Sequence, residues 1–254
     1  DFLEQFPRII TCHRDLDCNS SQVFYMQQGL PWHVGKTYNG PKGYNFSKRY
    51  DYDELKTMKS FPKTKEISVI TSNKQLTDGH RNRIAFVEKL KQHFGSRLDV
   101  FGKGICDVDD KWDAIADYKY HIVIENSPFE DSWTEKLSDT FLAGTYPIYY
   151  GCPNLKDYFS EDVFTPIDID DIDQAIIAIE RCIDEQKYEK SIEQIFHARE
   201  LVLDQYNIFP LMAGFIEKYM ANQSTQVKEK VSLRPKKYWN SMRHRMNKFF
   251  GIDI

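Results

Sequence analysis

The chain has 254 residues, of which 41% are apolar, 14% aromatic and 28% charged, and its formal net charge is −4. This composition is typical of a globular protein and excludes disorder over most of the length, because the aromatic residues alone can fill a core. The sequence holds no apolar run of the roughly 18 residues that a membrane-spanning helix needs, and its acidic body does not resemble a nucleic-acid binder.

The predicted elements fall into two parts. Before residue 65 we expect only short strands at 8–12 and 23–26, followed by a segment over 36–64 without a clear period, which indicates a linker. From residue 66 onward, strands alternate with helices, a pattern that predicts an α/β fold with a doubly wound parallel sheet. The strands are expected at 67–70, 98–101, 120–124 and 146–150, and the helices at 80–94, 109–117, 134–143, 171–185, 189–206 and 209–221.

The last residues differ in charge from the rest. Residues 227–254 carry a net charge of +6, which leaves −10 for residues 1–226. Helical spacing would place apolar side chains on one face of this tail and basic ones around it, as in helices that lie on a membrane surface. Packing of the tail on its own protein, or disorder, is the alternative. The apolar positions are Trp239, Met242, Met246, Phe249 and Phe250.

The cysteines give no metal-binding pattern. There are five, with no CxxC pair, and reduced thiols are the simpler interpretation, although a Cys12–Cys18 disulfide is possible. Glycosylation triplets at Asn19, Asn45 and Asn222 only weakly favour secretion.

The strongest candidate for chemistry follows the strand at 120–124. Glu125, Asn126 and Ser127 stand at the strand end, and Glu135 and Lys136 stand in the first turn of the next helix. A helix N-terminus attracts phosphate, and a lysine there costs helix stability unless an anion is bound. The structural alternative is a capping box from Ser132 to Glu135 with Lys136 solvated at the surface.

A second candidate begins the helix after the first strand of the sheet. Within residues 80–83, an arginine could hold a diphosphate through paired hydrogen bonds, with Asn73 and Lys74 as weaker neighbours. The alternative is a solvated basic turn. Neither a dinucleotide-binding GxGxxG nor a P-loop motif occurs.

Metal ligation is weakly indicated. Asp107 with Asp109, and Asp168 with Asp170, form DxD patterns that bind metal and diphosphate in some glycosyltransferases, but each lies in a turn before a helix, where Asp commonly caps. His33 and His80 have no partner at a recognisable spacing. We therefore expect no metal site.

These motifs together resemble the signature of glycosyltransferase family 10, the α-1,3/4-fucosyltransferases. The resemblance covers about residues 66–220 and rests on three segments. They are Arg83-x-x-Phe86-Val87-x-x-Leu90, then Tyr118-x-Tyr120-x-x-x-x-Glu125-Asn126-Ser127, then Thr134-Glu135-Lys136-Leu137 continuing to Gly144-Thr145-Tyr146-Pro147-Ile148-Tyr149-Tyr150-Gly151. One departure is Ser132-Trp133, where many members have Tyr-Val, so a nucleotide contact by that tyrosine does not carry over.

The resemblance implies a GT-B arrangement of two Rossmann-like domains, of which the C-terminal one binds GDP-fucose. It implies the inverting transfer of fucose to a glycan hydroxyl, on an acceptor that contains N-acetylglucosamine or is similar to lipopolysaccharide. Arg83, Lys136 and Glu135 would be catalytic, and Asn73, Glu125, Asn126 and Ser127 would complete the donor site. No cofactor is required, and Mn²⁺ or Mg²⁺ is possible but not indicated. The alternatives are another inverting nucleotide-sugar transferase, or a binding module that is inactive without an N-terminal domain.

The domain prediction follows from the same resemblance. Residues 1–35 would end an acceptor-side domain, 36–64 would be a linker, 65–222 would bind GDP-fucose and 223–254 would form the basic tail. Because the chain begins at Asp1 without a leader, we expect it to start inside a longer protein or after a removed segment. Bacterial relatives lie at the cytoplasmic membrane face and eukaryotic ones in the Golgi. The basic tail and the odd number of cysteines favour the former.

Overall fold

A five-stranded parallel sheet forms the centre of the computed structural model, which describes residues 2–16, 20–31, 34, 50, 52–73 and 78–219. The strand order is β4-β3-β5-β6-β7, and every neighbouring pair is parallel. The α/β prediction with a doubly wound parallel sheet is confirmed. The strands are β3 (Lys65–Ile70), β4 (Leu98–Phe101), β5 (Tyr118–Ile124), β6 (Tyr146–Tyr150) and β7 (Thr165–Pro166).

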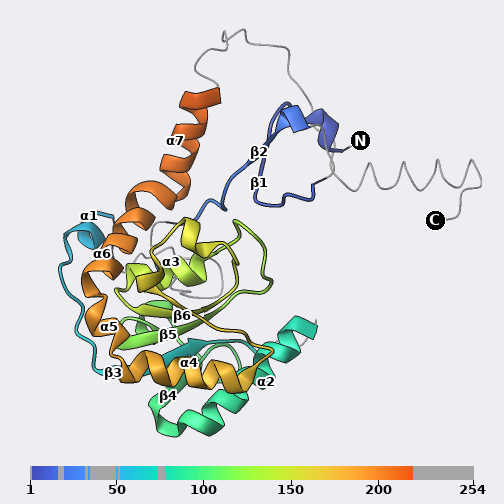
Figure 1. Ribbon diagram of the computed structural model, residues 1–254. Coiled ribbons are helices and arrows are strands. Elements are labelled where there is room, and N and C mark those ends of the chain that lie inside the picture. The colour runs from blue at the N-terminus through green and yellow to red at the C-terminus, as the bar shows by residue number, and fades with distance from the viewer. Residues whose placement is uncertain are drawn as a thin grey trace, which may run out of the picture.

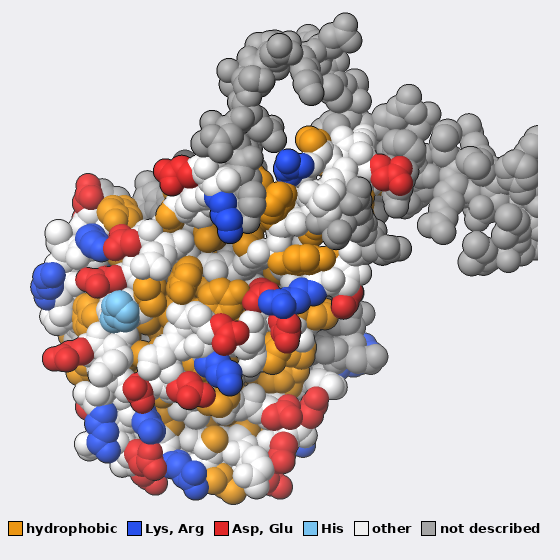
Figure 2. Space-filling model, turned by 45° about the horizontal axis from the view of Figure 1, so that its top comes forward, with side chains coloured by type: hydrophobic (Ala, Val, Ile, Leu, Met, Phe, Trp, Pro, Cys, Tyr) orange, Lys and Arg blue, Asp and Glu red, His pale blue; other side chains and the backbone are white. Residues whose placement is uncertain are grey.

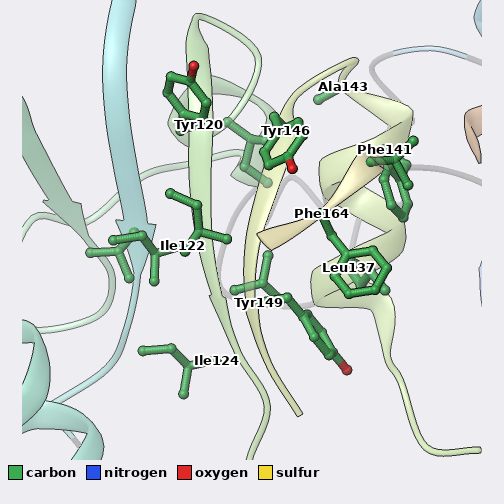
Figure 3. Close-up of a cluster of buried hydrophobic side chains, with 14 of the residues drawn as sticks. Tyr120, Ile122, Ile124, Leu137, Phe141, Ala143, Tyr146, Tyr149 and Phe164 are labelled. Atoms are coloured by element: carbon green, nitrogen blue, oxygen red, sulfur yellow. The ribbon is translucent and has the colours of Figure 1, made fainter. Parts of the chain in front are cut away.

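Helices cover both faces of this sheet. On one face lie α2 (Asp78–Phe94) and α4 (Ile172–Asp184), and on the other lie α3 (Glu135–Leu142) and α6 (Ile192–Leu201), as Figure 1 shows. A strand covered on both faces needs apolar residues throughout, and in β5 the five residues from Tyr120 to Ile124 are buried. Figure 3 shows part of the core, with side chains of β5, β6 and α3 gathered in one cluster.

Several elements differ from those predicted. The helix expected over 109–117 is the short 3-10 helix η4 (Lys111–Ala114), which Asp110 caps by accepting the Trp112 N–H at 2.9 Å. The helix expected over 189–206 divides into α5 (Lys187–Lys190), α6 and a π-helical turn (Val202–Tyr206). Strand β7 was not predicted, because two residues, one of them proline, give no strand pattern. The remaining 3-10 helices are η1 (Leu3–Gln5), η2 (Ser20–Gln22), η3 (Gly95–Arg97), η5 (Leu155–Asp157) and η6 (Glu161–Val163).

The described residues before the sheet include a helix and a pair of short strands. Helix α1 (Tyr52–Thr57) lies within the expected linker and buries Leu55 in the core. The predicted strands near the N-terminus are present as β1 (Ile9–Thr11) and β2 (Val23–Tyr25), which pair in parallel. Helix α7 (Ile208–Tyr219) contacts this pair of strands through the rings of Phe24 and Phe215. The domain boundaries themselves stay a prediction.

The described surface carries both signs of charge. Figure 2 shows acidic and basic side chains interspersed over one face, with apolar side chains between them. Among the described helices, none is both long and apolar enough to cross a membrane. Cys12, Cys106, Cys152 and Cys182 carry free thiols.

Some sequence predictions lie outside the described residues. These are the basic tail over 227–254, its possible membrane contact, Cys18, Lys74, His33, the three glycosylation triplets and the side chain of His80.

Candidate functional site

The candidate site lies where the connections of the sheet change direction. The chain leaves β3 toward β4 on one side, and it leaves β5 toward β6 on the other. Ligands of doubly wound sheets bind at the carboxyl ends of the two strands that flank such a point. Arg83 of α2 follows β3, Asn126 follows β5, and the Arg83 Nη1 donates a hydrogen bond of 3.0 Å to the Asn126 Oδ1. The structure therefore brings together the two candidate segments.

Arg83 is a buried cation whose donors are not all used. Only 8% of the residue is exposed, and the Nε atom has no hydrogen-bond partner in the part of the chain that the structure describes. Burial lowers the pKa of Arg83 below its ordinary value, because the charged form loses its hydration. A buried guanidinium with a donor left over is costly to folding, and a bound anion would remove that cost.

Glu125 organises the start of α3. Its carboxylate accepts the Thr134 backbone N–H at 2.8 Å, the Thr134 hydroxyl at 2.8 and 2.9 Å, and the Lys136 ammonium at 3.0 Å. The side chain is only 2% exposed. Gly151 leaves room for it, because any side chain at 151 would collide with the Glu125 Cγ. Glu125 thus holds Thr134 and Lys136 in place, and both oxygens of its buried carboxylate accept hydrogen bonds from them.

The structural alternative, a capping box from Ser132 to Glu135, is wrong. The N-cap is Thr134, whose hydroxyl accepts the Lys136 N–H, and the helix begins at Glu135. The Ser132 hydroxyl instead accepts a 3.0 Å hydrogen bond from Gln28 in the N-terminal segment. The local pattern failed because the carboxylate that serves this helix end comes from Glu125, at the end of the strand.

Glu135 and Lys136 are both partly exposed in the first turn of α3. The Lys136 ammonium lies 4.0 Å from the Glu135 carboxylate, and these side chains are 30% and 42% exposed. Burial opposes ionisation of Glu135, but Lys111 and Lys136 outweigh it and hold the pKa of Glu135 below its ordinary value. The first turn therefore presents an ionised carboxylate and a fixed ammonium side by side.

Sequence reasoning missed Lys111, His121 and Asp139. Together with Glu135 and Lys136 they line a cavity of about 110 Å³ between the sheet and α3. Lys111 comes from η4, and no local spacing signals its contact with α3. His121 and Asp139 each lie in a mainly apolar stretch of sequence. A polar residue at a position expected to be buried was the only sign that could have pointed to them.

Two residues predicted to bind the sugar donor, Asn73 and Ser127, do not join the contacts around Arg83 and Glu125. Asn73 is exposed after β3, where its N–H donates to the Lys103 carbonyl at 3.3 Å, and Ser127 is exposed in the loop after β5. In the DxD patterns, Asp107 accepts the Gly104 N–H and Asp168 accepts the Asp170 N–H, as turn-forming aspartates do. The described residues hold no group of three His, Cys, Asp or Glu placed to bind a metal ion.

Comparison with known proteins identifies the family of this arrangement. The profile of "glycosyltransferase family 10 (fucosyltransferase) C-term" matches residues 60–189, just over half of the chain. The chain belongs to glycosyltransferase family 10. The match contains Arg83, Asn126, Glu135 and Lys136.

Two curated relatives of this family 10 chain are fucosyltransferases. Over 92 residues it is 28% identical to the GDP-fucose protein O-fucosyltransferase 3 of Danio rerio, which covers 31% of this chain and 20% of that protein. Over 87 residues it is 36% identical to the alpha-(1,3)-fucosyltransferase 4 of Bos taurus, which covers 32% and 21%. The chain therefore spans about a fifth of the length of the relatives it matches.

Solved structures are similar at lower identity. An alpha1,3-fucosyltransferase with GDP-fucose is 20% identical with a TM-score of 0.42, and the match covers 56% of this chain and 49% of that one. A glycosyltransferase from Rickettsia africae is 11% identical with a TM-score of 0.48, covering 87% and 62%.

The loop after β5 of this family 10 chain is fastened at Asp131. This residue has a left-handed backbone, with φ of 58°, and its buried carboxylate accepts hydrogen bonds from Arg14, Asn154 and Tyr158. Trp133 is fully buried against the rings of Tyr158, Phe159 and Tyr206. Arg14 and Gln28 thus connect the N-terminal segment to the loop that leads to Glu135.

The buried histidine of the cavity predicts a measurable acid sensitivity. Burial, and then Lys111 and Lys63, lower the pKa of His121 from 6.5 to about 3. Unfolded protein then binds a proton that folded protein does not, so stability is lost as the pH falls below 6.5. The loss from this group is up to about 1.4 kcal/mol per pH unit. We expect His121→Gln to remove this contribution and so to change the slope of unfolding free energy against pH between 4 and 6.5, as measured by urea denaturation.

The matched control is Ser68→Ala, which removes the 2.7 Å hydrogen bond to the His121 Nδ1 but keeps the imidazole. This variant is expected to lower stability by about 1 kcal/mol at every pH and to retain the slope. Equal slopes in wild type and His121→Gln would contradict the assignment.

Proposed function

We propose that this chain binds GDP-fucose and forms the donor half of an inverting fucosyltransferase of GT-B type. The observation that carries the proposal is the hydrogen bond between Arg83 and Asn126 at the change of direction in the sheet. Glu125, the chain neighbour of Asn126, binds Lys136 at the N-terminus of α3. A buried arginine with a donor left over and a helix N-terminus are both suited to a diphosphate. The family match covers all four residues.

The proposed chemistry follows from where charge develops. An acceptor oxygen attacks the anomeric carbon of fucose from the face opposite the phosphate, the bond to the phosphate oxygen breaks with its electron pair, and GDP leaves. The hydroxyl proton passes to a general base. Arg83 and Lys136 would stabilise the charge that builds up on the leaving diphosphate. The step as proposed relies on these side-chain cations and calls on no metal ion.

Glu135 is proposed to accept hydrogen bonds from donor hydroxyls. Its carboxylate is ionised, partly exposed and next to Lys136, so it can meet a ribose or sugar hydroxyl beside the diphosphate. The acceptor that we propose is a hydroxyl of a glycan, reached from the side of the N-terminal segment.

Calorimetric titration of the 254-residue chain with GDP-fucose, GDP and UDP-glucose tests the proposal. We expect GDP-fucose and GDP to bind and UDP-glucose to bind at least about 100-fold more weakly, because a site built to hydrogen-bond one base leaves polar groups unpaired with another. Binding of UDP-glucose in preference to the GDP compounds would overturn the fucosyl assignment. Transfer of radiolabelled fucose to glycan acceptors by the chain then separates an enzyme from a binding module.

A further inference from the structure

Lys111, which has no role in the proposed function, lies between two carboxylates of α3. Its ammonium lies 3.1 Å from the Asp139 Oδ2 and 3.5 Å from the Glu135 Oε1. Glu135 and Asp139 are four residues apart on one helix, so they stand one above the other on the same face. Lys111 belongs to η4 and therefore joins the strand connection before β5 to the first turn of α3.

The two carboxylates that contact Lys111 differ in exposure, and this difference suggests different roles for them. The Asp139 side chain is 3% exposed and the Glu135 side chain is 42% exposed. Burial raises the pKa of Asp139 to about 6, and Lys111 opposes that rise. For Lys111, burial disfavours the charge, but the two carboxylates outweigh it and raise its pKa. The buried Asp139 therefore holds a charged Lys111, and the exposed Glu135 is the group free to change partners.

We propose that Lys111 is a positioning residue that holds the Glu135 carboxylate toward the hydroxyls of the nucleotide sugar. The inference rests on the proposed function and adds a residue to the same site. Without Lys111, the first turn of α3 keeps only Lys136 near Glu135, at 4.0 Å, and Lys136 is itself bound to Glu125 at 3.0 Å. Glu135 would then be free to adopt rotamers that do not face the donor.

A double-mutant cycle distinguishes positioning from a purely structural contact. Lys111→Met is made together with Asp139→Asn, so that no buried carboxylate is left without its partner, and this joint change is combined with Glu135→Ala. Variants that keep Lys111 also keep Asp139. The full chain is titrated with GDP-fucose in a calorimeter. Lys111→Met is expected to weaken binding about tenfold when Glu135 is present and less than about twofold in the Glu135→Ala background.

Two further variants complete the design. Lys111→Arg keeps the charge and the reach, and it is expected to restore most of the affinity. Lys119→Met removes another lysine–glutamate contact, between Lys119 and Glu189 at 2.6 Å, and is expected to leave GDP-fucose binding unchanged. Equal weakening by Lys111→Met in both Glu135 backgrounds, or no weakening in either, would overturn the proposal.

Failure of the proposed function gives a different result. If the parent chain binds neither GDP-fucose nor GDP, the function is wrong, and positioning is then judged by carbon-13 NMR of the Glu135 carboxyl. The charged and titratable groups around this carboxyl are Lys111, Lys136, Asp139, Glu125 and His121. Loss of Lys111 is expected to raise the carboxyl pKa of Glu135 and broaden its signal. An unchanged titration would overturn the contact itself.

Discussion

Replacing Arg83 with methionine is expected to weaken GDP binding about 30-fold, or about 2 kcal/mol. The guanidinium is the buried cation at the change of direction in the sheet, and its Nε has no partner within the described residues. Methionine keeps the length and apolar character of the stem. The same change is expected not to lower the melting temperature, because it removes a buried charge that folding must desolvate. Calorimetry and thermal unfolding monitored by circular dichroism measure the two effects.

The control for this prediction is Arg97→Met. Arg97 lies near the amino end of β4, away from the site, and pairs with Glu66 at 2.6 Å on the surface. Its loss is expected to leave GDP affinity unchanged. A lower melting temperature with unaltered GDP affinity in Arg83→Met would show that Arg83 is a structural residue.

Replacing Glu125 with alanine is expected to lower the free energy of unfolding by about 3 kcal/mol. The change leaves the Thr134 N–H and the Lys136 ammonium without the buried carboxylate that they share. The loss of side-chain packing beside Gly151 adds to this cost. Urea denaturation followed by far-ultraviolet circular dichroism measures the stability directly.

Glu135→Ala is the matched control, because Glu135 is a carboxylate in the helix turn that Glu125 supports and its side chain is 42% exposed. Its replacement is expected to change stability by no more than about 1 kcal/mol. If the two alanine variants were equally stable, Glu125 would not be the anchor of α3. A fall in donor affinity confined to Glu135→Ala would separate the residue that meets the ligand from the residue that supports it.

The sheet could be predicted from sequence because its strands are locally marked. The run from Tyr120 to Ile124 is apolar except for His121, and Gly144 and Gly151 end the neighbouring elements. Such signals depend only on residues close together in the chain. The resemblance to the family implied that Arg83 and Asn126 belong to one site, and in the structure they meet where the carboxyl ends of parallel strands share one edge.

The supporting contacts could not be predicted, because they join residues far apart in sequence. Lys111 meets Asp139 across 28 positions, and Glu125 meets Lys136 across 11. The motif around Thr134 was recognised from the sequence, but the separate roles of its residues in capping and supporting α3 were not. Glu125 was assigned to the donor site, and its burial beneath the helix end could not be foreseen. Ser132 was the alternative cap of the helix that Thr134 caps.

The strand order also determines when the sheet can form during synthesis. Strand β3 is the first of the five in the chain, yet it pairs along both edges, with β4 and with β5. Its second edge stays open until residues 118–124 have emerged, since Ser68 meets His121 across 53 positions. Parallel pairing at such separations is slow, and an open apolar edge recruits other chains. Fragments that end before Tyr118 are therefore expected to aggregate, whereas those that extend through Tyr150 can complete the central strands.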